Sequence, residues 1–248
     1  MQIISLIYRT VFYKPIYNLL LFFASILPNG DLGVAIILIT IIARTILFPL
    51  THKTTTMQRK MKEIEPKVKE IQREHKNDRE KQGQLLMALY REHGVNPITS
   101  IFLLFLQFPL FIALFQVFTV SFDPSSPFIY SFISFPTHIN TLFLGFIDLK
   151  KPSLLLAFLA AGLQFFQLKL SLPPTTNNTS QPSTPNPQKS MIYVLPVMIF
   201  LFSAPLPFGW HIFPTLPAAA ALYWTMNNLF AIVHEALVRR KAQRIIAA

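Results

Sequence analysis

The chain has no cysteine and few glycines, and acidic residues are scarce within its apolar stretches. Without cysteine there is no disulfide framework, no thiolate metal site and no cysteine nucleophile. The seven glycines include no GxxxxGK[ST] loop that would cradle a phosphate. The six histidines are scattered and form no HExxH pair, and the apolar stretches lack the paired carboxylates that acid–base catalysis uses. We therefore expect neither an enzyme nor a bound metal or other cofactor.

What the sequence has is apolar length. Of its 248 residues, 52% are hydrophobic and only 13% are charged, and the mean hydropathy is +0.44. This composition is typical of membrane proteins, in which a spanning helix needs about 20 mainly apolar residues. Five stretches fit that length, the fourth being short and containing Pro196 and Pro205: 31–50, 97–120, 153–172, 191–208 and 218–238. The sequence thus predicts an all-α polytopic membrane protein.

The net charge of +11 is unevenly distributed. Segment 51–96 holds eleven Lys and Arg residues and the tail 239–248 holds four, whereas segment 121–152 holds two. Lys and Arg are enriched in cytoplasmic loops, so 51–96 and 239–248 are expected inside a cell membrane that the chain crosses several times. Five spans then place the N-terminus outside and the C-terminus in the cytoplasm. This distribution argues against specific nucleic-acid binding.

The remaining segments have different expected roles. Residues 1–30 are apolar around two basic residues and predict an amphipathic helix in the outer membrane interface; a cleaved signal or an extra span are the alternatives. The aromatic-rich segment 121–152 is expected outside, against the membrane surface. Segment 173–190 is rich in Pro, Thr and Asn and predicts a flexible cytosolic loop. Residues 209–217 predict an extracytoplasmic loop.

Segment 51–96 carries two apolar stripes at helical spacing. The stripes predict two antiparallel helices that form a cytosolic hairpin, with Pro66 interrupting the first arm. A connection between two spans would need only a few residues, which favours a function for the hairpin over a simple linker. For any single charged residue of the hairpin, a solvated surface is the alternative. The stripe residues are Met57, Met61, Ile64, Val68 and Ile71, then Leu85, Leu86, Leu89 and Tyr90.

Arg44 is a charged residue within the first apolar stretch. An arginine inside a span costs about 2.5–3.5 kcal/mol on insertion scales, so such residues usually mark functional sites. Arg44 lies six residues from the cytosolic end of its stretch, or about 9 Å at 1.5 Å per residue. Its guanidinium is therefore expected either to reach up to the headgroups or to lie in a polar cavity open to the cytosol.

Five further polar or amphipathic residues of the spans are candidate partners in such a cavity. Thr40 precedes Arg44 by one helical turn, Gln164 and Gln167 share a face of the third span, and Trp224 and Asn228 share a face of the fifth. The alternative is that these side chains hydrogen-bond between helices and only hold them together.

Several motifs resemble those of the YidC/Oxa-type membrane protein insertases. They are GVAIILITIIARTILFPLTHKTTTMQRKMKEIEPKVKEIQ, then LYREHGVNPITSIFLLFLQFPLFIALFQVF, and LPAAAALYWTMNNL in the last span. The resemblance covers about residues 15–240 in the family's order. It implies a five-transmembrane-helix insertase core with a hydrophilic groove that is open to the cytosol and to lipid and closed outside.

The resemblance also implies roles for particular residues. Arg44 matches the family's groove arginine, Thr40 and Trp224 match positions on the groove wall that meet substrate, and Gln164 or Gln167 corresponds to a groove glutamine. The implied partners are nascent membrane proteins and the lipid bilayer. The ribosome, the signal recognition particle pathway and the Sec translocon are candidate partners, although the basic tail is shorter than the one some members use on ribosomes.

The sequence hypothesis is therefore a membrane protein insertase and chaperone that works without a nucleotide. A small transporter or channel with a buried arginine is one alternative, and a membrane assembly scaffold is another. A transporter predicts a pathway open on two sides and internal repeats, which the sequence does not show. A scaffold would tolerate the loss of Arg44.

Overall fold

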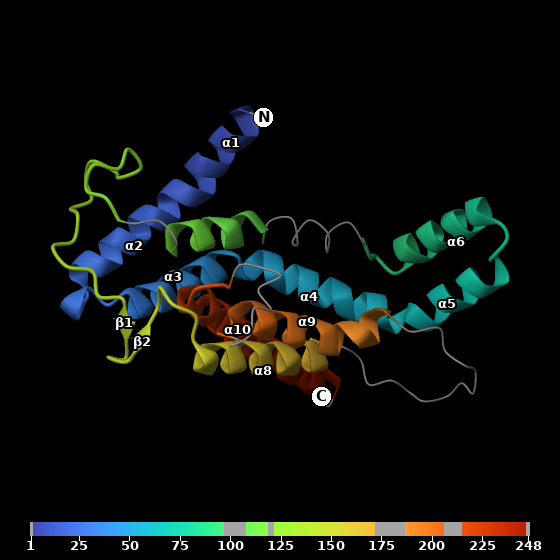
Figure 1. Ribbon diagram of the computed structural model, residues 1–248. Coiled ribbons are helices and arrows are strands. Elements are labelled where there is room, and N and C mark those ends of the chain that lie inside the picture. Colours follow the sequence, from blue (N-terminus) through green and yellow to red (C-terminus); the bar gives the residue numbers. More distant parts are fainter. Residues whose placement is uncertain (1, 97–107, 119–121, 172–186, 206–214, 247–248) are drawn as a thin grey trace. The chain divides into compact units, whose positions relative to one another are not determined.

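The computed structural model describes residues 2–96, 108–118, 122–171, 187–205 and 215–246, most of which are helical (Figure 1). The chain divides into two compact units. We call Met1–Thr45 together with Leu110–Ala248 the core unit, and Ile46–Pro109 the hairpin unit.

The N-terminal segment is helical in three successive pieces: α1 (Gln2–Tyr8), the π-helix η1 (Arg9–Tyr13) and α2 (Lys14–Ile26). One face of α2 is fully buried, since Tyr17 and Leu21 lie one turn apart and Leu20 lies between them on the same side. The helix expected over residues 1–30 is therefore present, and its second half packs into the core unit. Its interfacial position stays a prediction.

The first predicted span is a shorter helix than its apolar run. Helix α3 (Leu32–Ile46) has 15 residues, which is about 22 Å of helix. The predicted span ended at residue 50, but Pro49 has no N–H to donate to the preceding turn, so α3 ends and α4 (Phe48–Glu63) begins around Leu47.

Helices α8 (Leu154–Ser171), α9 (Pro187–Ser203) and α10 (Ala218–Ile246) complete the core unit together with residues 110–118 of the short helix Phe108–Phe118. Helix α8 packs against both α9 and α10, as Figure 1 shows. Within the described residues, α8 is the one helix that is both long and apolar enough to cross a bilayer by itself; α3, Phe108–Phe118 and Ser190–Ser203 are apolar but shorter.

Helices α9 and α10 also have boundaries that differ from the predicted segments. Helix α9 begins at Pro187, inside the predicted loop 173–190, and α10 continues to Ile246, through most of the predicted tail. The tail sequence contains no glycine or proline to stop a helix, which explains the extension. Most of the second predicted span, most of the loop 173–190 and residues 209–214 lie outside the described residues.

The segment before α8 joins the beginnings of the core helices. It forms a small antiparallel hairpin, β1 (Leu142–Phe143) with β2 (Ile147–Asp148). The first N–H groups of a helix have no partner within it. Here the N–H of Leu32 donates to the carbonyl of Asn140 (3.0 Å), and those of Ala218 and Ala219 donate to the carbonyls of Lys151 (2.9 Å) and Leu149 (3.0 Å). The starts of α3 and α10 are thus tied to one connection.

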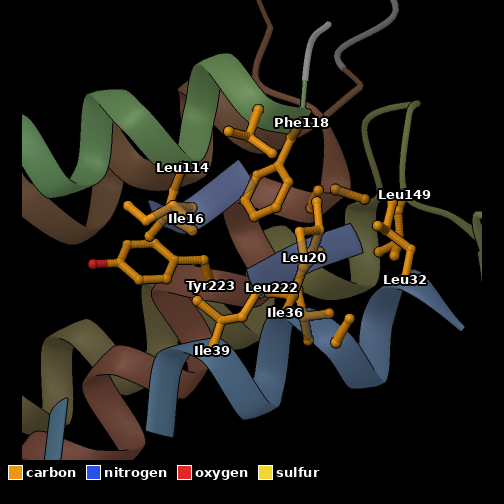
Figure 2. Close-up of a cluster of buried hydrophobic side chains, with 14 of the residues drawn as sticks. Ile16, Leu20, Leu32, Ile36, Ile39, Leu114, Phe118, Leu149, Leu222 and Tyr223 are labelled. Atoms are coloured by element: carbon orange, nitrogen blue, oxygen red, sulfur yellow. The ribbon is translucent and has the colours of Figure 1, made fainter. Parts of the chain in front are cut away.

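The hydrophobic core lies beside this connection (Figure 2). It combines side chains mainly from α2, α3, the helix Phe108–Phe118, the connection before α8 and α10. The labelled members are Ile16, Leu20, Leu32, Ile36, Ile39, Leu114, Phe118, Leu149, Leu222 and Tyr223. The four alanines Ala218–Ala221 are almost completely buried, because small side chains let neighbouring helices approach closely.

The hairpin unit has a small core of its own. The first arm breaks where Pro66 predicts, since α4 ends at Glu63 and α5 (Glu65–Glu74) carries Pro66 in its first turn. Helix α6 (Arg79–Glu92) returns and packs against α5, and Asp78 caps it by accepting a hydrogen bond from the Lys81 N–H. The buried side chains come from the predicted stripes and the residues beside them: Ile64, Leu89 and Val95, with Met57, Met61, Val68, Ile71 and Tyr90 packed against them.

Gly33 lets the strand hairpin pack directly on α3, and this gives a stability prediction. A Cβ at Gly33 would overlap the Phe143 ring, so Gly33→Ala forces the ring away and is expected to destabilise the fold by about 1–3 kcal/mol. Gly162 in α8 is the matched control, because nothing lies within 4 Å of its added Cβ. Gly162→Ala should stabilise by about 0.5–1 kcal/mol. Thermal unfolding in detergent measures both, and equal shifts would contradict the packing role of Gly33.

Candidate functional site

Arg44 lies in the last turn of α3 and reaches across to α10. Its Nε donates a hydrogen bond to Oδ1 of Asn227 at 2.6 Å, and its Nη2 donates to the same oxygen. The side chain is half-buried. A cation in the last turn of a helix also interacts favourably with the negative end of the helix dipole. The guanidinium is therefore held between two helices.

The burial along α3 explains why a charge is tolerated at this point. The buried residues of α3 all lie between Leu32 and Thr40, whereas Ile41, Thr45 and Ile46 are exposed. The helix thus begins in the core and leaves it within its last two turns. Arg44 lies in this second part, where its long apolar stem can pack and its guanidinium can find an acceptor.

Asn227 is a residue that the sequence reasoning missed. The face of α10 was assigned from the four-residue spacing of Trp224 and Asn228, although Asn227, three residues after Trp224, also neighbours it on the helix surface. The available signal was the doubled asparagine itself, because two adjacent amides in an apolar helix both need partners.

Asn228 has a different partner from Asn227. Its side chain is 3% exposed, and its Nδ2 donates to the carbonyl oxygen of Ala160 on α8 at 3.3 Å. Consecutive helical residues are rotated by about 100° around the axis, so the two amides face different neighbours. Asn227 connects α10 to α3 and Asn228 connects α10 to α8. For Asn228, this is the hydrogen bonding between helices that was considered as the alternative to a cavity.

Thr40 is buried more deeply than the other candidates. It is 1% exposed, and its hydroxyl donates to the carbonyl of Ile36 in its own helix at 2.7 Å. The hydroxyl is therefore already paired within α3. Its place on a groove wall stays a prediction, and a substrate would meet it only after the surrounding side chains move.

The two glutamines form a hydrogen-bonded row along α8. Nε2 of Gln164 donates to Oε1 of Gln167 at 3.1 Å, and Nε2 of Gln167 donates to the hydroxyl of Ser171 at 3.0 Å. Gln164 is buried and the other two are half-buried. Ser171 was not among the predicted residues, although its i, i+4 spacing from Gln167 was available in the sequence. Polar side chains thus continue to the last residue of the described helix.

Trp224 is half-buried and packs against an aromatic side chain of the neighbouring helix. Its ring centroid lies 5.0 Å from that of Phe111, and Tyr223 lies on the same phenylalanine at 6.2 Å. Tyr223 belongs to the buried core, so Trp224 lies at the edge of the core.

The structure therefore gives several of the predicted site residues a hydrogen-bond partner. It pairs Arg44 with α10, Asn228 with α8, and the two glutamines with each other. What these groups offer chemically is hydrogen bonding, above all to carboxylates, for which a guanidinium is suited. Among the described residues, no three His, Asp or Glu side chains lie together as metal ligands would.

These features define a helical protein whose apolar helices carry a few hydrogen-bonded polar side chains between them. The chain belongs to the family described as 60Kd inner membrane protein, whose sequence model matches residues 22–244. The matched range includes α3, α8 and α9 and nearly all of α10. It therefore contains every predicted site residue as well as Asn227.

Individual relatives carry the name membrane protein insertase YidC. The protein of Wolinella succinogenes is 31% identical over 231 residues, which cover 93% of this chain and 37% of the relative. That of Pelobacter propionicus is 32% identical over 244 residues, covering 96% and 40%. That of Oceanobacillus iheyensis is 29% identical over 238 residues, covering 94% and 84%. The chain thus spans about two fifths of the first two relatives and most of the third.

The bond between Asn228 and Ala160 leads to a second stability prediction. Asn228→Ala removes the hydrogen bond between α10 and α8 and should destabilise the protein by about 0.6–1.7 kcal/mol, the range for such bonds in membrane proteins. Thr225→Ala is the control, because the Thr225 hydroxyl donates only to Ala221 in its own helix and should matter less. Thermal unfolding in detergent compares them, and an equal or smaller loss for Asn228→Ala would contradict the connecting role.

Proposed function

We propose that this chain inserts newly made membrane proteins into the membrane and assists their folding. The observation that carries the proposal is Arg44, a half-buried cation in an apolar helix whose hydrogen bonds go to a neutral amide of a second helix. Support comes from the family match over residues 22–244 and from relatives named membrane protein insertase YidC. The proposed activity requires neither a nucleotide nor another cofactor.

The proposed architecture is the five-span core with the N-terminus outside. Its spans would contain α3, the helix Phe108–Phe118, α8, α9 and the first part of α10. The connection at residues 140–151, which ties the starts of α3 and α10, would then lie on the outer side. The burial near these helix starts supports a core that is closed there, and the polar residues further along support one that is open to the cytosol.

In the proposed mechanism, the hydrophilic tail of a nascent protein enters from the cytosol while its apolar segment meets the lipid. Arg44 would pair with acidic groups of the tail, and Gln167, Trp224 and neighbouring side chains would offer it hydrogen bonds and a polar surface. The tail would thus cross a shorter stretch of hydrocarbon. Burying about 20 apolar residues supplies the driving force, and the membrane potential acts on charged tails, so no ATP is required.

The hairpin unit is the proposed contact for delivery partners. Its helices α5 and α6 pack around only a few apolar side chains and carry many charged ones, as expected of a unit that projects into water. The ribosome, the signal recognition particle pathway and the Sec translocon remain the partners to be tested against it.

Replacing Arg44 tests the proposed function. Arg44→Ala should lower the insertion of substrates with acidic tails by about tenfold in reconstituted vesicles, because a charge-assisted hydrogen bond is lost. Arg44→Lys keeps the positive charge but loses the paired N–H donors that bind both oxygens of a carboxylate. Its insertion rate should therefore lie between those of the unchanged protein and Arg44→Ala. Thr45→Ala is the matched control, since the Thr45 side chain is exposed and its hydroxyl donates only to Ile41 within α3.

Insertion by Arg44→Ala at the rate of the unchanged protein would exclude Arg44 from the mechanism and would favour a scaffold. Transport of a small solute by purified vesicles, with no insertion, would favour the transporter.

Cysteine labelling tests the direction of access, and the absence of native cysteine makes single replacements clean. We expect cysteines at Gln167 and Trp224 to react with a membrane-impermeant maleimide added from the cytosolic side only. Thr40→Cys should react much more slowly, because that side chain is 1% exposed. Reaction from both sides would indicate a pore, and no reaction at any position would indicate packed helices without a groove.

A further inference from the structure

We infer that Asn227 is a positioning residue that occupies the carboxylate-binding edge of Arg44 while the site is empty and is displaced by an acidic group of the substrate. The inference rests on the proposed function and adds the resting partner of Arg44.

The geometry of the contact identifies the edge. A guanidinium binds a carboxylate through two parallel N–H donors, and Nε with Nη2 form one such pair. Both of these donors point to the single oxygen Oδ1 of Asn227. An incoming carboxylate would present two oxygens to the same two donors, so it and Asn227 cannot occupy that edge together.

Replacement of the Asn227 amide by a substrate carboxylate is favourable because the carboxylate is charged. Asn227 offers one neutral oxygen, whereas a carboxylate offers two that share a negative charge, and hydrogen bonds between charged partners are the stronger ones. A neutral resting partner therefore holds the arginine without neutralising it. A resting aspartate at the same place would compete with every acidic substrate.

The surroundings hold the Asn227 backbone, whereas its side chain is only partly buried. The next residue, Asn228, is anchored to α8 through Ala160, and Tyr223, one turn earlier, is buried in the core. Asn227 and Arg44 are themselves only half-buried. In the inferred exchange, the Asn227 side chain rotates away from the guanidinium while α10 stays in place.

The first experiment measures the capping of Arg44 without using insertion. In the full chain reconstituted in vesicles, the rate at which phenylglyoxal modifies Arg44 is followed by mass spectrometry. Asn227→Ala should raise this rate several-fold, Asn227→Asp should lower it, and Asn227→Gln, which keeps the amide, should restore it toward the original value. Thr225→Ala serves as the control, since its hydroxyl bonds within α10. Equal rates in all variants would overturn the inference.

The second experiment compares two substrates that differ only in an acidic or a neutral tail. Asn227→Asp should lower the ratio of acidic-tail to neutral-tail insertion by about tenfold, the loss expected when one charge-assisted contact is blocked. Asn227→Ala should raise the ratio by no more than about twofold, because it removes only a neutral and therefore weak competitor for the edge. A merely structural role would affect both substrates alike, so an unchanged ratio in Asn227→Asp would overturn the inference. If the unmodified protein inserts neither substrate, the proposed function fails. The rates of phenylglyoxal modification then test by themselves whether Asn227 covers Arg44.

Discussion

The pairing of backbone groups at the helix starts is the constraint on which the core unit depends. The first N–H groups of an apolar helix find no partner inside it, and in an apolar environment each one left unpaired is costly. The connection from Asn140 to Lys151 supplies carbonyls to Leu32, Ala218 and Ala219, so α3 and α10 begin at the same place. The buried alanines of α10 and the glycine at position 33 allow the close approach that this arrangement requires.

Along the helices that begin at this connection, the first residues and the later residues have different properties. Near the starts of α3 and α10 the side chains are apolar and buried in the hydrophobic core. Further along α3, α8 and α10, partly buried polar groups such as Arg44, Gln167 and Asn227 are tolerated because each has a hydrogen-bond partner on the same or a neighbouring helix. A polar site at one end of an otherwise apolar core is the feature that the proposed insertion mechanism uses.

Much of the fold was predictable from local patterns. The starts of α8 and α10 lie within a residue of the predicted starts, because a long apolar run that follows a proline is typical of a helix beginning there. Most residues of the stripes in 51–96 lie in the small core of the hairpin unit, as predicted, whereas Leu85 is exposed and Leu86 is not part of that core. The break between α3 and α4 was not predicted, since hydropathy outweighed Pro49, and the continuation of α10 to Ile246 was hidden by the change from apolar to basic residues.

By itself the sequence determined that the protein is helical and apolar and which family it resembles, because these follow from composition and spacing. It also indicated that Arg44 marks a functional site, because an isolated charge in an apolar helix is costly. Only the tertiary structure decided what Arg44 binds. Its partner lies 183 residues away, and the choice between Asn227 and Asn228 depends on how α10 is rotated toward α3 and α8. That rotation is set by the packing of Leu222 and Tyr223 in the core, which no local pattern encodes.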